Sequence, residues 1–76
     1  MKNRINSYFL GARFKNSVNG HFDLALKDAI AQRDIFLDEY NDSIDVIDEK
    51  LDFQTVRLSE NNFYVFGIIT LSYYKK

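Results

Sequence analysis

The 76-residue chain contains no cysteine, proline or tryptophan, and only one histidine, His21. The lack of cysteine excludes disulfide bonds, thiolate chemistry and every zinc site with sulfur ligands. A lone histidine also argues against a structural zinc site, so the chain lacks the cross-links that stabilise many small domains. The three glycines, Gly11, Gly20 and Gly67, are scattered, which excludes a glycine-rich phosphate loop.

Positive and negative charges are nearly balanced. Ten Lys and Arg residues against eleven Asp and Glu residues give a net charge of -1. Such a chain has no overall field that would draw it to nucleic acid or to an acidic membrane. No segment approaches the roughly 18 apolar residues of a membrane span, and residues 1–4 are not followed by the apolar region of a signal peptide. We therefore expect a cytoplasmic protein with no membrane or direct nucleic-acid partner.

Apolar residues are abundant, at 46% of the chain, and aromatic residues make up 16%. This composition is too apolar for a disordered chain. Its length allows one hydrophobic core, so we expect a single domain over residues 1–76. With no disulfide or metal available, packing or association between copies has to supply its stability.

Apolar residues between Phe22 and Tyr40 recur at i, i+3, i+4, i+7 and i+8. This spacing predicts an amphipathic helix over residues 19–39, with Ser17 and Asn19 as candidate N-terminal caps. Residues 4–15 alternate with the period of a strand that has one better-buried face. Two more strands are predicted over residues 44–58 and 63–74, joined by a hairpin turn at 59–62, where asparagine tolerates positive φ.

The order strand, helix, strand, strand predicts an α+β fold. Residues 63–74 are apolar on both faces, which is typical of a central strand. We therefore expect a three-stranded antiparallel sheet of order 1-3-2 with one helix packed on one face. The apolar parity changes between Val46 and Ile47, which indicates a bulge or bend. Gly11 and Gly67 lie inside predicted strands and mark a bend or a close approach of the helix; our preferred interpretation is a notch under an aromatic ring.

The helix can cover only one face of this sheet. The other face would expose Tyr64, Phe66, Ile68 and Tyr74, with contributions from the other two strands. Such a patch exceeds what a soluble monomer usually exposes, so we expect a second copy of the chain to cover it in a dimer or larger homo-oligomer. The alternative is that Thr70, Ser72 and the tyrosine hydroxyls make this face polar enough to remain in water.

Acidic side chains are concentrated in residues 38–52, which hold seven carboxylates. One interpretation is a negative patch that binds a basic host protein. The other is a solvated strand edge whose carboxylates prevent aggregation. The spacing lacks the alternating ligands and central glycine of a calcium loop, so we expect no metal site. The candidate partner-binding residues are Asp42, Asp45, Asp48, Glu49 and Asp52.

The segment VIDEKLDF at residues 46–53, followed by FYVFGIITLSYYK at residues 63–75, resembles the second half of a small sporulation-protein family. Members occur in Bacillus-type bacteria, with similar proteins in phages of Gram-positive hosts, and read VIDIKY and later Y-x-hydrophobic-IIYK. The helix segment FLDE at residues 36–39 fits the same layout. The resemblance covers the C-terminal half and implies a fold and a bacterial or phage origin. It implies no site residues, because the family has no established biochemical activity.

The chain is also similar to the dodecins, short β-α-β-β chains that assemble into flavin-binding shells. The dodecin flavin site uses a tryptophan for stacking, which this chain lacks. We therefore expect no flavin or other cofactor. The resemblance leaves a second hypothesis, an oligomer that holds small ligands between aromatic residues at subunit contacts.

Catalytic residues are not indicated. His21 lies two residues before Asp23, and side chains at this spacing on a helix do not face each other. The chain also has no cysteine and no serine in a recognisable nucleophile elbow for a histidine to activate. We therefore expect a non-enzymatic interaction or accessory protein that self-associates through its sheet and binds or modulates a host protein.

Overall fold

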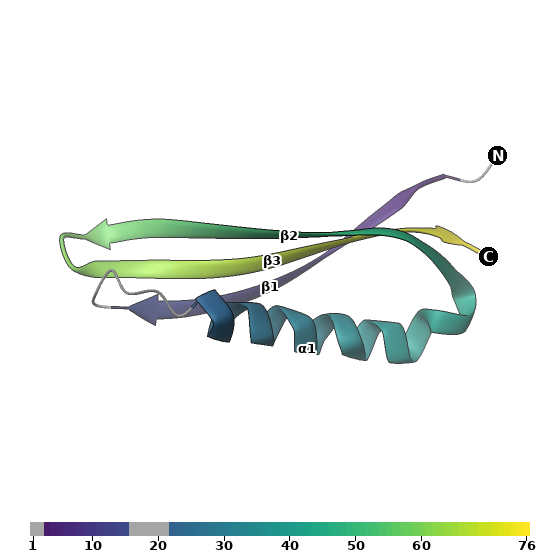
Figure 1. Cartoon of the computed structure of the whole chain (residues 1–76), viewed down its shortest axis with the longest axis horizontal. Helices are drawn as coiled ribbons and strands as arrows, with labels where there is room; N and C mark the ends of the chain where they lie inside the picture. Colours follow the sequence, from purple (N-terminus) through teal and green to yellow (C-terminus); the bar gives the residue numbers. More distant parts are fainter. Residues whose placement is uncertain (1–2, 16–21) are drawn as a thin grey trace.

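The computed structural model describes residues 3–15 and 22–76. A strand, a helix and two further strands follow one another along the chain, as predicted (Figure 1). The elements are β1 (Ile5–Lys15), α1 (Phe22–Tyr40), the short 3-10 helix η1 (Asn41–Ser43), β2 (Ile44–Ser59) and β3 (Asn62–Lys75). The candidate helix caps Ser17 and Asn19 lie outside the described residues.

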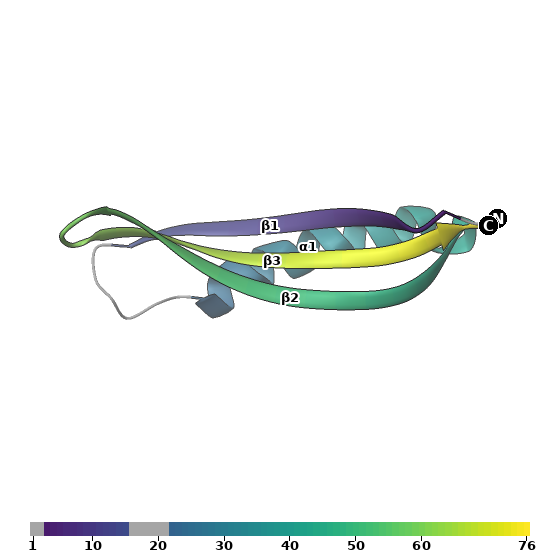
Figure 2. The ribbon, with the colours of Figure 1, turned by 90° about the horizontal axis from the view of Figure 1, so that it is seen from above.

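The three strands form one open antiparallel sheet in the order β1-β3-β2, which confirms the predicted α+β fold and strand order. Figure 2 shows β3 between the other two strands, with α1 behind them. The helix runs along one face of the sheet, so the molecule is an elongated two-layer body of 50 × 22 × 13 Å. The opposite face carries no covering element of the described chain.

The hydrophobic core lies between α1 and the sheet. Alternate residues of β3 supply most of it, and Ile69 and Leu71 are fully buried. From the helix, Ala25 and Ala29 face the sheet and are completely buried. The buried core side chains are Phe9, Ala25, Ala29, Ile44, Val65, Ile69, Leu71 and Tyr73.

Two glycines allow the helix to approach the sheet closely. Gly11 of β1 and Gly67 of β3 are direct cross-strand partners. A Cβ atom on Gly11 would overlap the backbone carbonyl oxygen of Ala25, and one on Gly67 would lie 2.7 Å from the backbone nitrogen of Leu26. The expected close approach of the helix is confirmed. The expected aromatic ring over this notch is wrong, because the helix backbone itself occupies the notch.

The position of this notch also decides which strands the helix covers. Since both glycines belong to β1 and β3, α1 packs on these two strands and leaves β2 largely to one side. On the helix side of β2, Leu51 is 45% exposed and Phe53 is 48% exposed. Phe53 meets the helix through the ring of Phe22, with centroids 5.3 Å apart. The sheet therefore has one strand, β2, that the helix only partly shields.

The pairing of β2 with β3 is irregular at two places. Val46 pairs with Tyr73 and Asp48 with Ser72, so Ile47 is the extra residue of a bulge, as the change of parity predicted. The second irregularity lies between Arg57 and Ser59, next to the hairpin turn. The turn falls at the predicted residues, and no residue in the described segments has a positive φ, so the turn does not use the tolerance of asparagine for that region.

Candidate functional site

The candidate site is the face of the sheet opposite α1, named here the open face. Residues of β1 with even numbers pair across to residues of β3 with even numbers, and both sets point away from the helix. On β1, Tyr8 is 67% exposed, Leu10 48% and Phe14 57%. The apolar zone of the open face consists of Tyr8, Leu10, Ala12, Phe14, Tyr64, Phe66 and Ile68.

The four residues predicted to form an interface all lie on the open face. Tyr64 is 39% exposed, while Phe66, Ile68 and Tyr74 are half-buried because neighbouring strands flank the central strand. The ring of Tyr64 packs edge-on against that of Phe14, with centroids 5.6 Å apart, and stacks with Phe66 at 6.1 Å. These contacts join β1 and β3 into one aromatic surface near the β2–β3 hairpin.

The sequence prediction did not name the β1 residues of this surface. Tyr8, Leu10 and Phe14 fall on one parity of residues 4–15, and that parity is the more apolar one. The signal was therefore present in the pattern. What the pattern lacked was the position of the helix, which follows from the glycine pair and places the odd-numbered residues of β1 inward.

A cluster of polar side chains lies at the other end of the open face. The hydroxyl of Ser72 is buried, donates a hydrogen bond to Asn6 Oδ1 at 2.7 Å and accepts one from Arg4 Nη2 at 3.1 Å. Arg4 Nη2 also lies 3.8 Å from a carboxylate oxygen of Asp48. Because these groups satisfy one another, this end of the face is polar and linked across all three strands.

The predicted partner-binding acids are divided between different surfaces. Asp45, Asp48 and Asp52 pair with open-face residues of β3, and the bulge at Ile47 is what brings Asp45 and Asp48 to the same face. Each has a basic side chain within 4 Å, at 3.7 Å for Lys76 and Asp45, 3.8 Å for Arg4 and Asp48, and 3.7 Å for Lys50 and Asp52. Between residues 45 and 52, the open face of β2 is therefore charged with both signs.

Glu49 and Asp42 lie apart from this group. Glu49 pairs with Leu71 on the helix side of the sheet, and its carboxylate accepts a hydrogen bond of 2.8 Å from Arg33 of α1. A hydrogen bond from Arg33 to Asp34, together with the charge of Glu49, raises the pKa of the arginine above its ordinary value. Asp42 is exposed in η1. The five acids thus do not form one continuous patch.

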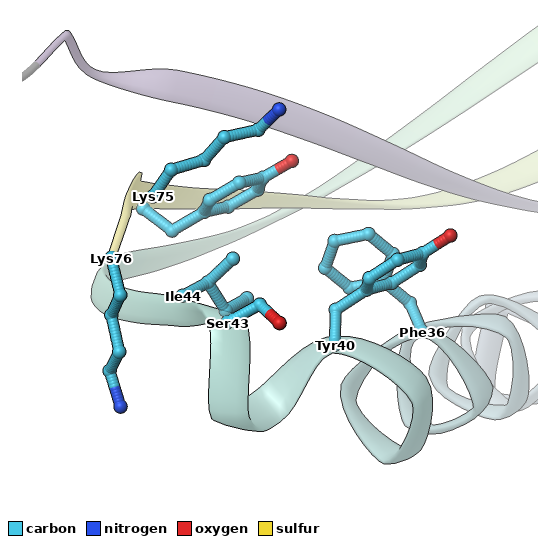
Figure 3. Close-up of a pocket in the computed structure, with 7 residues that line it drawn as sticks. Phe36, Tyr40, Ser43, Ile44, Lys75 and Lys76 are labelled. Atoms are coloured by element: carbon cyan, nitrogen blue, oxygen red, sulfur yellow. The ribbon is translucent and has the colours of Figure 1, made fainter.

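A pocket of about 520 Å³ opens where α1, η1 and the end of the sheet meet (Figure 3). Its wall includes a packed aromatic group, in which the Phe36 ring lies 5.0 Å from Tyr40 and 5.7 Å from Tyr73. The side chain of Lys76 points away from the labelled rings (Figure 3). The lining residues are Phe36, Tyr40, Ser43, Ile44, Tyr73, Lys75 and Lys76.

Within residues 3–15 and 22–76, no group of three or more His, Cys, Asp or Glu side chains could hold a metal ion. No helix in the described part of the chain combines the length and the hydropathy that crossing a membrane requires. His21 lies outside the described residues, so its predicted lack of a catalytic role stays a prediction.

Comparison of the chain with protein-family models, with curated proteins and with solved structures found no match. The resemblances to the sporulation family and to the dodecins therefore stay predictions from the sequence.

Proposed function

We propose that this chain is a non-enzymatic interaction protein whose open face joins two copies and whose charged margin binds a further protein. The observation that carries the proposal is the apolar zone of the open face. In a single copy, Tyr8, Leu10 and Phe14 are each about half exposed or more. Soluble monomers rarely expose so contiguous an apolar surface, and such patches are typical of interaction sites.

The arrangement of apolar and charged residues on the open face favours a second copy of the chain as its partner. The apolar zone covers β1 and β3, whereas the open face of β2 carries Asp48, Lys50 and Asp52. A two-fold axis that lies in the plane between the two sheets, perpendicular to the strands, would pack one apolar zone against the other. The charged residues would then lie at the margin of the interface. Apolar centres with polar rims are typical of protein interfaces. Large apolar side chains contribute about 1.5–3 kcal/mol each when fully buried, so several together can offset the cost of association, about 4–15 kcal/mol.

The charged margin is the proposed contact for a partner of a different kind. The side chains of Asp45, Asp48 and Asp52 are 50%, 62% and 51% exposed, and their basic neighbours lie 3.7–3.8 Å away. Exposed ion pairs of this kind contribute little, about 0–1 kcal/mol. A basic host protein can therefore replace them at small cost. The expected role is accessory, the binding or modulation of a host protein.

Sedimentation tests the self-association. We expect the wild-type chain to have a mass of at least twice 9.0 kDa, and Ile68→Asp to dissociate it, because a carboxylate buried without a partner costs several kcal/mol. Since Ile68 is half-buried, this variant can also unfold. Leu10→Glu changes a side chain that is 48% exposed in the single copy and separates the two effects. A wild-type monomer at high concentration would overturn the proposal.

The second candidate function is an oligomer that binds small ligands. The pocket beside Phe36, Tyr40 and Tyr73 favours it, because ligand pockets are commonly apolar and about 300–1,000 Å³ in size. A coloured or ultraviolet-absorbing compound that co-purifies with the protein would support this function. Capture of a basic protein, with no bound small molecule, would favour the interaction protein.

A further inference from the structure

The two outer edges of the sheet differ in how they are protected. On β1, the helix engages the edge strand directly, since Gln32 Nε2 donates a 2.8 Å hydrogen bond to the backbone carbonyl of Leu10. Arg13 of the same strand forms a 2.9 Å ion pair with Asp28 of α1. The other edge, β2, is 16 residues long and lies to one side of the helix. An unprotected strand edge presents unpaired backbone groups to any other strand.

Protection of the β2 edge is concentrated in its first half, and the second half has only Arg57 and the irregularity between Arg57 and Ser59 at its end. Bulges and charged side chains both discourage edge-to-edge pairing, and β2 has the bulge at Ile47 and its acids between residues 45 and 52. Residues 53–58 read FQTVRL and contain no acid. In this half, Phe53, Val56 and Leu58 are 48%, 46% and 54% exposed. The second half of the edge is therefore open, free of acidic side chains and suited to pairing.

We propose that residues 53–57 of β2 pair antiparallel with the same residues of a second copy, which extends the sheet to six strands. The charge pattern argues for this occupant. With Thr55 on the two-fold axis, Asp52 lies opposite the partner subunit's Leu58. The two Asp52 side chains are then about 20 Å apart at roughly 3.4 Å per residue, which is beyond the Debye length of about 8–10 Å. A register centred on residues 48–52 would instead place carboxylates opposite carboxylates, which is destabilising.

The edge contact is separate from the open-face contact. A two-fold axis perpendicular to the sheet keeps each side chain on its own side, so Phe53 and the partner subunit's Arg57 meet on the helix side. The open faces of the two copies become one continuous surface that remains available to the first interface. The inference therefore goes beyond the proposed function and does not depend on it. Where both contacts form, the assembly contains four copies, as two six-stranded sheets packed face to face.

Two matched variants test the edge contact. Thr55 and Val46 are both exposed on the helix side of β2. Thr55 lies at the centre of the pairing segment, and Val46 lies outside it. We expect Thr55→Glu to halve the sedimentation mass of the wild type, because two carboxylates then oppose each other at the axis. Val46→Glu should leave the mass unchanged, and circular dichroism verifies that each variant is folded. A Thr55→Glu protein with the wild-type mass would overturn the inference.

Hydrogen exchange provides a test that needs no variant. We expect those amides of residues 53–57 that point away from β3 to be as protected as the amides of β3 at high protein concentration and to lose this protection on dilution. Concentration-independent exchange in these residues would contradict the edge contact. The open-face variant Leu10→Glu distinguishes the two proposals. If Leu10→Glu dissociates the protein and Thr55→Glu does not, the open face alone is an interface; the reverse result leaves only the edge.

Discussion

The two faces of the sheet are both apolar, yet the helix covers only one of them. On β3, the inward residues Val65 and Ile69 are 3% and 0% exposed, whereas Tyr64 on the open face is 39% exposed. On β1 the more apolar side chains are not the ones that the helix covers. The side chains on the helix side include Ser7 and Arg13, whereas those on the open face are mainly aromatic and aliphatic. The helix thus lies where Gly11 and Gly67 let its backbone approach, and backbone shape decides which face is covered.

The largest expected effect comes from filling the notch. Gly11→Val would place side-chain atoms where the Ala25 carbonyl lies, and no rotation of the new side chain relieves an overlap that begins at Cβ. We expect the free energy of unfolding to fall by more than about 4 kcal/mol, a range that single substitutions reach through few mechanisms, overpacking among them. Urea denaturation measures the change. Ala31→Val, at an exposed position of α1, is the control and should shift stability by about 0.7 kcal/mol or less.

Equal truncations on the two faces should have unequal effects. Ile69→Ala removes a fully buried side chain from the covered face and should lower the free energy of unfolding by about 2–5 kcal/mol at any protein concentration. Leu10→Ala removes a side chain that is 48% exposed in the single copy. Its loss of stability should appear only at concentrations where copies associate. Equal, concentration-independent losses would show that the open face is not an interface.

The polar end of the open face should show an intermediate effect. Ser72→Ala removes a buried hydroxyl that bonds to Asn6 and Arg4, and leaves both without that partner. We expect a loss of about 1–3 kcal/mol in the free energy of unfolding. A double-mutant cycle with Asn6→Ala measures the coupling between the two side chains. Additive losses would contradict the view that the two groups stabilise each other.

The smallest effect on stability is expected at the charged margin. Asp45→Asn combined with Asp48→Asn alters exposed carboxylates and should change the free energy of unfolding by about 0.5 kcal/mol. Binding of an oligolysine peptide, measured between about 50 and 500 mM salt, should become weaker and less dependent on salt. An unchanged salt dependence would remove the electrostatic contact and place partner binding on the aromatic strand. Asp42→Asn, in η1 and away from the face, is the matched control.

Much of the fold follows from local patterns in the sequence. The helical spacing from Phe22 to Tyr40, the strand periodicities and the two-sided apolar strand were enough to predict the order 1-3-2. The change of parity at Val46 and Ile47 located the bulge. These features were predictable because each depends on residues close together in the chain.

The sequence predicted a close approach of the helix at Gly11 and Gly67, but what occupies the notch depends on residues that are far apart in the chain. Gly11 and Gly67 meet only when β1 and β3 pair in a particular register, and Ala25 reaches them only after the helix docks. The alternation of side chains along β2 separates Glu49 from Asp48 beside it in the sequence, and helix docking then brings Arg33 to Glu49. Acidic residues that are close together in the sequence therefore suggest one patch, although their side chains lie on opposite faces of the sheet.

The central position of β3 has a consequence for how the protein is made. During synthesis β1 leaves the ribosome long before its partner strand β3, since Ile5 pairs with Tyr73 across nearly the whole chain. Until β3 is available, β1, α1 and β2 cannot form the sheet that buries their apolar residues. Folds dominated by such distant pairings form slowly and expose aggregation-prone segments on the way. The nascent chain should therefore depend on chaperones, or on slow translation, more than its small size would indicate.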